Sequence, residues 1–167
     1  AAKSFAEMLP KIFKECIEEK IQLKIFQQCL PSQKKHLEQE YKILNIECEI
    51  FSFSYDLLRY FKKVNLAITR SGSSMLAELL NCNIPIISIP FPSSADNHQL
   101  KNAKFFEKKG FGFLIEEQKI NEKLFLLIKS MHKDKNLLNE MRHTQNKYTD
   151  KKTFEKIDIH IKELIDV

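Results

Sequence analysis

The chain has 167 residues, of which 43% are hydrophobic, so it is long enough for one globular domain with a substantial core. Its formal net charge of +5 comes from lysines interspersed with glutamates, without a tryptophan or a dense basic block. This pattern is typical of solvated helix faces and argues against nucleic-acid binding. The cysteines lack the CxxC spacing of zinc sites, so we expect free, mostly buried thiols and no metal: Cys16, Cys29, Cys48 and Cys82.

Segments with strand-like and helix-like spacing alternate along the chain. The opening helix is expected over residues 5–17, with Pro10 either kinking it or starting a new first turn. Strands are expected over residues 21–28, 46–53, 64–69, 85–90 and 112–115. Further helices are expected over residues 32–44, 55–63, 73–81, 98–109, 120–132, 135–146 and 152–165. Ser32 is the expected cap of the first of these, and Gly110 the left-handed C-cap of the fourth.

This alternation predicts an α/β fold, with a Rossmann-like parallel sheet and helices on both faces. Ligands bind such sheets in the loops that follow the carboxyl ends of the strands. Two loops fit this rule: "TRSGSS" (69–74) after one buried strand and "FPSSADNH" (91–98) after the next. Since one helix and one strand join them, we expect both loops at the same edge of the sheet.

The first loop has the pattern of an anion site. Gly72 is expected to allow a sharp turn into the helix, whose first N–H groups, at Ser73, Ser74 and Met75, favour a phosphate. Glu78 lies in the second turn of the same helix, where a carboxylate can accept hydrogen bonds from both hydroxyls of a ribose. Taken alone, the loop is equally an ordinary Ser-rich helix start, and Glu78 a solvated side chain.

The second loop brings neutral polar groups to a helix start. Asp96 or Asn97 can cap this helix, and His98, Gln99 and Asn102 offer donors and acceptors suited to sugar hydroxyls and an acetamido group. The alternative is a capped helix with polar surface residues. Together the two loops predict a nucleotide-sugar pocket, because no catalytic triad, carboxylate pair or metal cluster competes with it.

The segment "TRSGSSMLAELLNCNIPIISIPFPSSADNHQLKNA" resembles the donor-binding C-terminal half of the MurG-type UDP-N-acetylglucosamine (UDP-GlcNAc) transferases, glycosyltransferase family 28. Weaker similarity extends over the whole chain. The resemblance implies the C-terminal half of a GT-B fold, in which two Rossmann-like domains enclose the active site. It also implies inverting transfer of GlcNAc from UDP-GlcNAc to a lipid-linked undecaprenyl-diphospho-muramoyl-pentapeptide in peptidoglycan synthesis, without a metal or other cofactor.

The resemblance assigns these residues to the UDP-GlcNAc site: Phe53, Ser54, Arg70, Gly72, Ser73, Ser74, Glu78, His98, Gln99 and Asn102. By the resemblance, Glu78 holds the ribose hydroxyls, the backbone after Gly72 meets the diphosphate, and Arg70 lines the nucleotide site. His98 and Gln99 contact the GlcNAc. By the resemblance, the backbone of Phe53 and Ser54 binds the uracil, and Asn102 supports the sugar-binding loop.

The chain also departs from the family pattern. The family's Gly-rich loop, the strand before it and the N-terminal acceptor domain with its catalytic base have no counterpart in the sequence. We therefore expect residues 1–167 to be a donor-binding domain, with 120–167 as a helical tail and no activity of its own. The strand that is lacking would lie centrally, between strands 21–28 and 64–69, and an exposed sheet edge there favours self-association.

The full-length protein is expected to be cytoplasmic and peripheral on the inner face of the bacterial plasma membrane. It meets the lipid-linked acceptor through the other domain, and we expect no nucleic-acid partner. The sequence leaves three other interpretations of the function open. They are the soluble subunit of a split UDP-GlcNAc transferase, a non-catalytic nucleotide-sugar-binding module and a basic nucleic-acid-binding domain.

Overall fold

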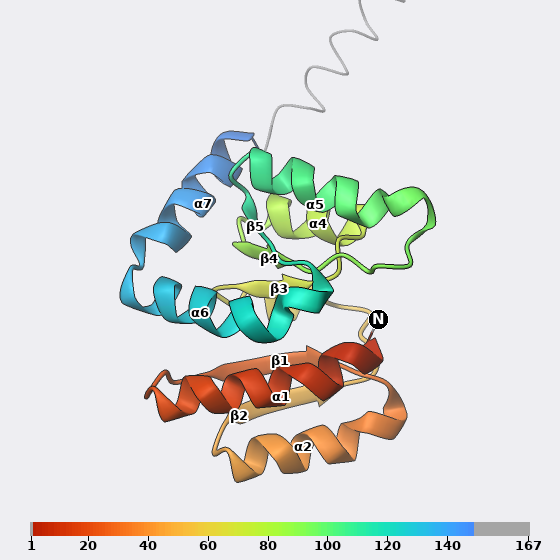
Figure 1. Cartoon of the computed structure of the whole chain (residues 1–167), viewed down its shortest axis with the longest axis vertical. Coiled ribbons are helices and arrows are strands. Elements are labelled where there is room, and N and C mark those ends of the chain that lie inside the picture. The colour runs from red at the N-terminus through yellow and green to blue at the C-terminus, as the bar shows by residue number, and fades with distance from the viewer. Residues whose placement is uncertain (1, 149–167) are drawn as a thin grey trace, which may run out of the picture.

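A computed structural model describes residues 2–148, and its strands form two parallel sheets (Figure 1). One sheet pairs β1 (Lys24–Gln28) with β2 (Glu47–Phe51). The other has the order β3 (Ala67–Thr69), β4 (Ile86–Ser88), β5 (Gly112–Leu114). The strands of both sheets run in the same direction, so their carboxyl ends lie along one edge of the molecule.

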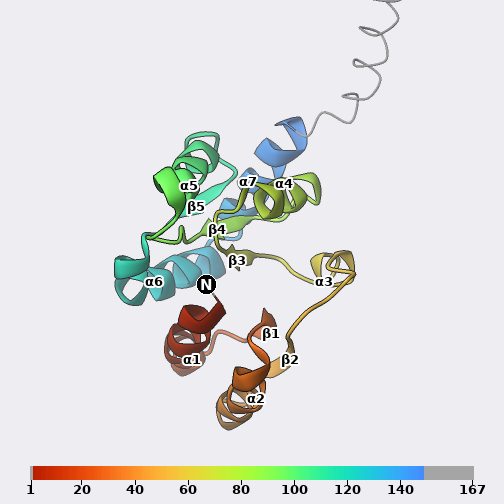
Figure 2. The same ribbon diagram turned by 90° about the vertical axis from the view of Figure 1, so that its right-hand side faces the viewer.

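The helices flank the sheets on both sides, with α1 and α6 on one side and α3 and α4 on the other (Figure 2). Their bounds are α1 (Ala2–Glu18), α2 (Lys34–Ile43), α3 (Leu58–Phe61), α4 (Ser73–Asn81), α5 (His98–Lys108), α6 (Ile120–Lys133) and α7 (Asn136–Tyr148). Three single 3₁₀ turns are η1 (Pro31–Gln33), η2 (Ala95–Asn97) and η3 (Glu117–Lys119). The α/β, Rossmann-like fold is thereby confirmed. The helix expected over residues 152–165 lies outside the described residues.

Two helix starts differ from the sequence expectation. Pro10 lies inside α1, which begins eight residues earlier at Ala2, so this proline does not start a new helix. Ser32 does not cap α2. It lies within η1, and Gln33, whose side chain makes no capping hydrogen bond to α2, is the N-cap. The Gln33 Oε1 atom instead accepts from the Leu30 N–H at 3.2 Å, which stabilises the preceding turn.

The sheet is interrupted between β1 and β3, whose facing edges are not hydrogen-bonded to each other. The break falls between the two strands where the resemblance predicts that a strand is lacking. It also explains why β3, expected to be buried, is only half-buried, whereas every residue of β4, which has a neighbour on each side, is buried.

A continuous apolar core nevertheless joins the two sheets on the α1 and α6 side. Ile12 of α1, Ile50 of β2, Ile87 of β4 and Leu124 of α6 belong to one cluster of buried side chains. Because α6 contributes to this core, it is packed into the fold rather than appended to it. A smaller cluster beneath α4 holds Leu76, Leu79, Ile84 and Ile86.

The glycines differ in what their positions require. Gly110 ends α5 with φ +75°, and the N–H groups of Gly110 and Phe111 return to the carbonyls of Glu107 and Phe106, which is a complete Schellman motif. At Gly112 a Cβ atom would lie 2.2 Å from the Ile86 carbonyl oxygen, so β5 can approach β4 only without a side chain there. Both sites need glycine, and Gly110 is the left-handed C-cap that the sequence predicts.

Candidate donor site at the carboxyl ends of β3 and β4

The loop after β3 leads directly into α4. The first backbone hydrogen bond of α4 is donated by the Leu76 N–H to the Gly72 carbonyl oxygen at 3.0 Å. The N–H groups of Ser73, Ser74 and Met75 therefore precede the intrahelical ladder and can donate to an anion. Ser73 and Ser74 are exposed, so the start of α4 is open to a ligand.

Gly72 does not make the sharp turn that the sequence suggests. Its φ of −66° and ψ of 135° are ordinary extended values, and a Cβ atom added there would have no neighbour within 4 Å. The backbone beside the α4 start thus faces open space. The adjacent Ser71 hydroxyl is buried without a hydrogen-bond partner among the described residues. An open backbone next to an unpartnered polar atom is consistent with an anion site.

Glu78 lies on the exposed face of α4, one turn after Ser74. It follows Ser73 by five residues, which places it about 7.5 Å along the helix from the first N–H groups. A carboxylate at that distance reaches a group attached to a phosphate held at the helix start. The ribose role of Glu78 stays a prediction.

Gln99, the second residue of α5, ties the two loops together. Its Oε1 atom accepts from the Phe91 N–H at 2.9 Å and from the Ser71 N–H at 3.3 Å. Asn102, one turn later in α5, donates from Nδ2 to the Ser71 carbonyl oxygen at 3.0 Å. Among the described residues, the Gln99 Nε2 group donates to no acceptor. The carbonyl end of this side chain is held by protein, while its amide end is free for a sugar.

The turn before α5 is built from left-handed backbone. Asp96 has φ 47° and Asn97, the N-cap of α5, has φ 52°. Asn97 is the N-cap of α5, but its side-chain amide makes no capping hydrogen bond. The Asp96 carboxylate does not cap this helix either. His98 is exposed, and its Nδ1 lies 2.7 Å from the Ala95 carbonyl oxygen. In the neutral ring this leaves Nε2 as a free acceptor.

Arg70 is turned away from open solvent and is held by protein groups. Its Nη1 donates to Glu117 Oε2 at 2.6 Å and to the carbonyl oxygens of Ile89 and Pro90 at 3.3 Å each. The nucleotide contact that the resemblance assigns to it stays a prediction. The structure adds an ion pair with Glu117 that the sequence does not predict. The two residues are 47 positions apart, and no spacing rule links them.

Phe53 and Ser54 lie in the loop that follows the carboxyl end of β2 and precedes α3. Phe53 is 67% exposed and meets the Tyr55 ring edge-on at 4.8 Å between centroids. The Ser54 hydroxyl donates to the Asp56 carbonyl oxygen at 3.0 Å and accepts from its N–H at 3.2 Å. This turn is closed on itself and has no hydrogen bond to the β3 and β4 loops among residues 2–148.

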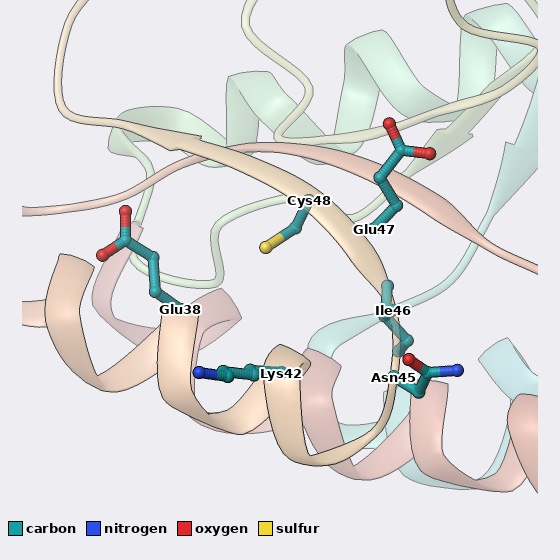
Figure 3. A pocket seen from close by; sticks show the side chains of 6 residues that line it. All are labelled: Glu38, Lys42, Asn45, Ile46, Glu47 and Cys48. Atoms are coloured by element: carbon teal, nitrogen blue, oxygen red, sulfur yellow. The ribbon is translucent and has the colours of Figure 1, made fainter.

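A surface hollow of about 380 Å³ lies away from these loops, where α2 ends and β2 begins (Figure 3). It is lined by Glu38, Lys42, Asn45, Ile46, Glu47 and Cys48. None of the predicted site residues lines it. Burial, with a smaller effect of Glu38, raises the pKa of the Cys48 thiol.

Within residues 2–148 no group of three or more His, Cys, Asp or Glu side chains is placed to hold a metal ion. None of the helices in this part of the chain is long and apolar enough to cross a bilayer.

Residues 1–158 match the model of the glycosyltransferase family 28 C-terminal domain. The chain belongs to this family. It is 38% identical over 125 residues to the UDP-N-acetylglucosamine–N-acetylmuramyl-(pentapeptide) pyrophosphoryl-undecaprenol N-acetylglucosamine transferase of Pelagibacter ubique, covering 75% of this chain and 35% of that protein. The similarly named protein of Rickettsia bellii is 35% identical over 134 residues, covering 76% of this chain and 38% of the relative.

The fold is also similar to that of Acinetobacter baumannii MurG, whose crystal structure matches with a TM-score of 0.80 and 22% identity. The match covers 98% of this chain and 47% of that one. The chain therefore spans roughly a third of the length of these curated relatives and about half of the solved structure. The predicted family and the Rossmann-like half of a GT-B fold are confirmed, and the roles of the individual site residues stay predictions.

Proposed function

We propose that this chain binds UDP-GlcNAc at the carboxyl ends of β3 and β4, as the donor half of an inverting N-acetylglucosaminyltransferase. The diphosphate lies at the start of α4, between Gly72 and Ser74. Glu78 accepts the ribose hydroxyls, and His98 and Gln99 meet the GlcNAc. The uracil lies toward Phe53 and Ser54.

The observation that carries this proposal is that the Gln99 Oε1 atom accepts hydrogen bonds from both loops. One side-chain oxygen binds an N–H group from each loop, which brings the sugar-type polar groups of α5 beside the anion-type start of α4. The phosphate and sugar subsites are thereby adjacent before any ligand binds, and preformed sites lose less free energy on ordering. The open backbone at Gly72 and the unpartnered Ser71 hydroxyl support a ligand at this point.

Titration calorimetry with UDP-GlcNAc tests the proposal. The Glu78→Gln variant removes the charge from the ribose acceptor, and because a hydrogen bond to a charged group contributes about 1.5–3 kcal/mol, affinity should fall roughly tenfold or more. Glu122→Gln, which changes an exposed glutamate in the first turn of α6, is the matched control and should bind like the parent chain. Absence of heat with UDP-GlcNAc, together with salt-sensitive DNA binding, would overturn the proposal in favour of a nucleic-acid-binding domain.

For the whole enzyme, we propose GlcNAc transfer to the lipid-linked undecaprenyl-diphospho-muramoyl-pentapeptide, with no metal or other cofactor. The names of the relatives support this substrate pair. The acceptor and the catalytic base belong to a second domain, so residues 1–167, including the helices from 120 onward, bind donor without turnover. We further propose a cytoplasmic location at the inner face of the plasma membrane, and self-association through the open edges of β1 and β3.

A further inference from the structure

A half-hidden charge cluster lies behind the rim of the proposed site, where α1, the end of β4 and η3 meet. Arg70 Nη1 and Glu117 Oε2 are 2.6 Å apart, and their side chains are 11% and 22% exposed. The Ser4 hydroxyl, from the first turn of α1, donates to Glu117 Oε1 at 2.6 Å and accepts from Arg70 Nη2 at 3.2 Å. The three side chains form a closed ring of hydrogen bonds.

The cluster holds the backbone that begins the second loop. The same Arg70 nitrogen that binds Glu117 also donates to the carbonyl oxygens of Ile89 and Pro90. The guanidinium lies 5.5 Å from the centroid of the Phe91 ring and 4.5 Å from that of Phe5. Such stacking favours one orientation of the planar cation.

Residues 89–91 are thus held from two directions. Arg70 binds the carbonyls of residues 89 and 90, and Gln99 binds the N–H of Phe91. Glu117 sets the orientation of Arg70 because it accepts its shortest hydrogen bond, at 2.6 Å. If Glu117 loses its charge, the guanidinium keeps the weaker carbonyl contacts and gains freedom to turn. Phe91 would then keep its hydrogen bonds to Gln99 and to the Ser94 N–H group but lose the fixed position of the guanidinium against its ring.

We propose that Glu117 and Ser4 are positioning residues of the donor site, which act through Arg70 to hold residues 89–91 in the geometry that Gln99 needs. This role rests on the proposed function. Neither residue touches the donor. Each contributes by keeping the Gln99 carbonyl engaged, so that its amide nitrogen faces the sugar.

The test compares Glu117→Gln with Glu19→Gln. Glu19 makes an ion pair of similar length, 2.7 Å, with Lys129. This pair also joins the α1 region to the α6 region, but at the far end of α1 from Ser4. UDP-GlcNAc affinity is measured by calorimetry at a temperature well below unfolding. We expect about a three- to tenfold loss in Glu117→Gln, in the range of couplings measured for residues that do not touch the ligand, and no loss in Glu19→Gln.

Amide hydrogen exchange of the ligand-free chain gives a second readout. We expect faster exchange at the Phe91 and Ser71 N–H groups in Glu117→Gln, and parental exchange at both in Glu19→Gln. Ser4→Ala, which keeps the ion pair, should change exchange and affinity in the same direction by a smaller factor.

Affinity within twofold of the parent in Glu117→Gln overturns the proposal, even if its unfolding midpoint falls, because the cluster would then stabilise the fold without positioning the rim. Equal losses in Glu117→Gln and Glu19→Gln overturn it as well. If the parent chain itself does not bind UDP-GlcNAc, the proposed function fails and this role fails with it. The exchange data then still decide whether the cluster holds Phe91.

Discussion

The two rims at the carboxyl edge of the molecule are built in contrasting ways. The β3–β4 rim is held by hydrogen bonds that cross between loops, at Gln99, Asn102 and Arg70. The β2 rim is joined to the end of β1 by the Gln28 Nε2 group, which donates to the Ser52 carbonyl oxygen at 3.1 Å. Its turn at Ser54 and Asp56 is closed by local hydrogen bonds, and Phe53 and Tyr55 stay exposed. On the proposed function, this difference predicts a preformed subsite for the phosphate and sugar, and a looser one for the base.

Among the substitutions that test this difference between the rims, Arg70→Met is expected to change the free energy of unfolding most. Removing the guanidinium leaves the Glu117 carboxylate without its cation and frees the carbonyls of residues 89 and 90, so the free energy of unfolding should fall by about 2–4 kcal/mol. Arg59→Met is the control at the β2 rim, where the pair with Glu49 is half-exposed and should contribute under about 1 kcal/mol. Urea unfolding of both variants measures the difference, and similar losses in the two would contradict it.

The next predicted effect distinguishes two roles of Gln99, which are to hold the two loops together and to bind the sugar. Gln99→Ala leaves two backbone N–H groups without their acceptor and should lower the free energy of unfolding by about 1–3 kcal/mol. Gln99→Glu keeps an acceptor for both, so it should retain most of that stability.

Calorimetry with UDP-GlcNAc and with UDP distinguishes these roles. In Gln99→Glu the amide donor is gone, so the preference for UDP-GlcNAc over UDP should fall. An unchanged preference would show that Gln99 only links the loops.

A smaller effect is expected in how the stability of the fold depends on pH. Burial of the Glu117 carboxyl opposes its ionisation, but hydrogen bonds from Arg70 and Ser4 and the charge of Arg70 outweigh burial and lower its pKa. A lowered folded-state pKa contributes stability that is complete above the unfolded value, about 4.3, and is lost as pH falls through the folded value. The difference in unfolding midpoint between the parent and Glu117→Gln should therefore narrow as pH falls below about 5. A difference that widens toward acid would contradict this assignment.

The smallest effect is expected at the β2 rim. Phe53→Ala removes a ring that is 67% exposed, so the free energy of unfolding should stay within about 0.5 kcal/mol of the parent. Urea unfolding measures it beside Gln99→Ala. A loss as large as that of Gln99→Ala would end the distinction between the two rims.

Local patterns predicted much of this architecture. The start of α4 at Ser73 followed from a serine-rich segment before an apolar helical pattern, and the end of α5 followed from Gly110. Strand lengths were overestimated, as at β1, which begins at Lys24 rather than at residue 21. Apolar alternation marks side chains that can be buried, whereas a strand also needs a partner for its backbone.

The loop residues were found because Gly72, Glu78 and Gln99 stand out in composition and match the family motif. Their supporting contacts were not predictable in the same way. Glu117 and Ser4 look like surface residues in the sequence, and only the fold brings them to Arg70. The residue type alone predicts a sharp turn at Gly72, but its backbone is ordinary, and open space is what distinguishes the position.

The interruption between β1 and β3 has a consequence for ligand length. No backbone ladder fixes the separation of the two sheets, so the distance from the Phe53 loop to the first turn of α4 depends on the side chains that α1 and α6 insert along the seam. Ile12 and Leu124 therefore act as spacers. On the proposed function, their volume would set the base-to-phosphate distance that the site accepts, although both side chains are buried.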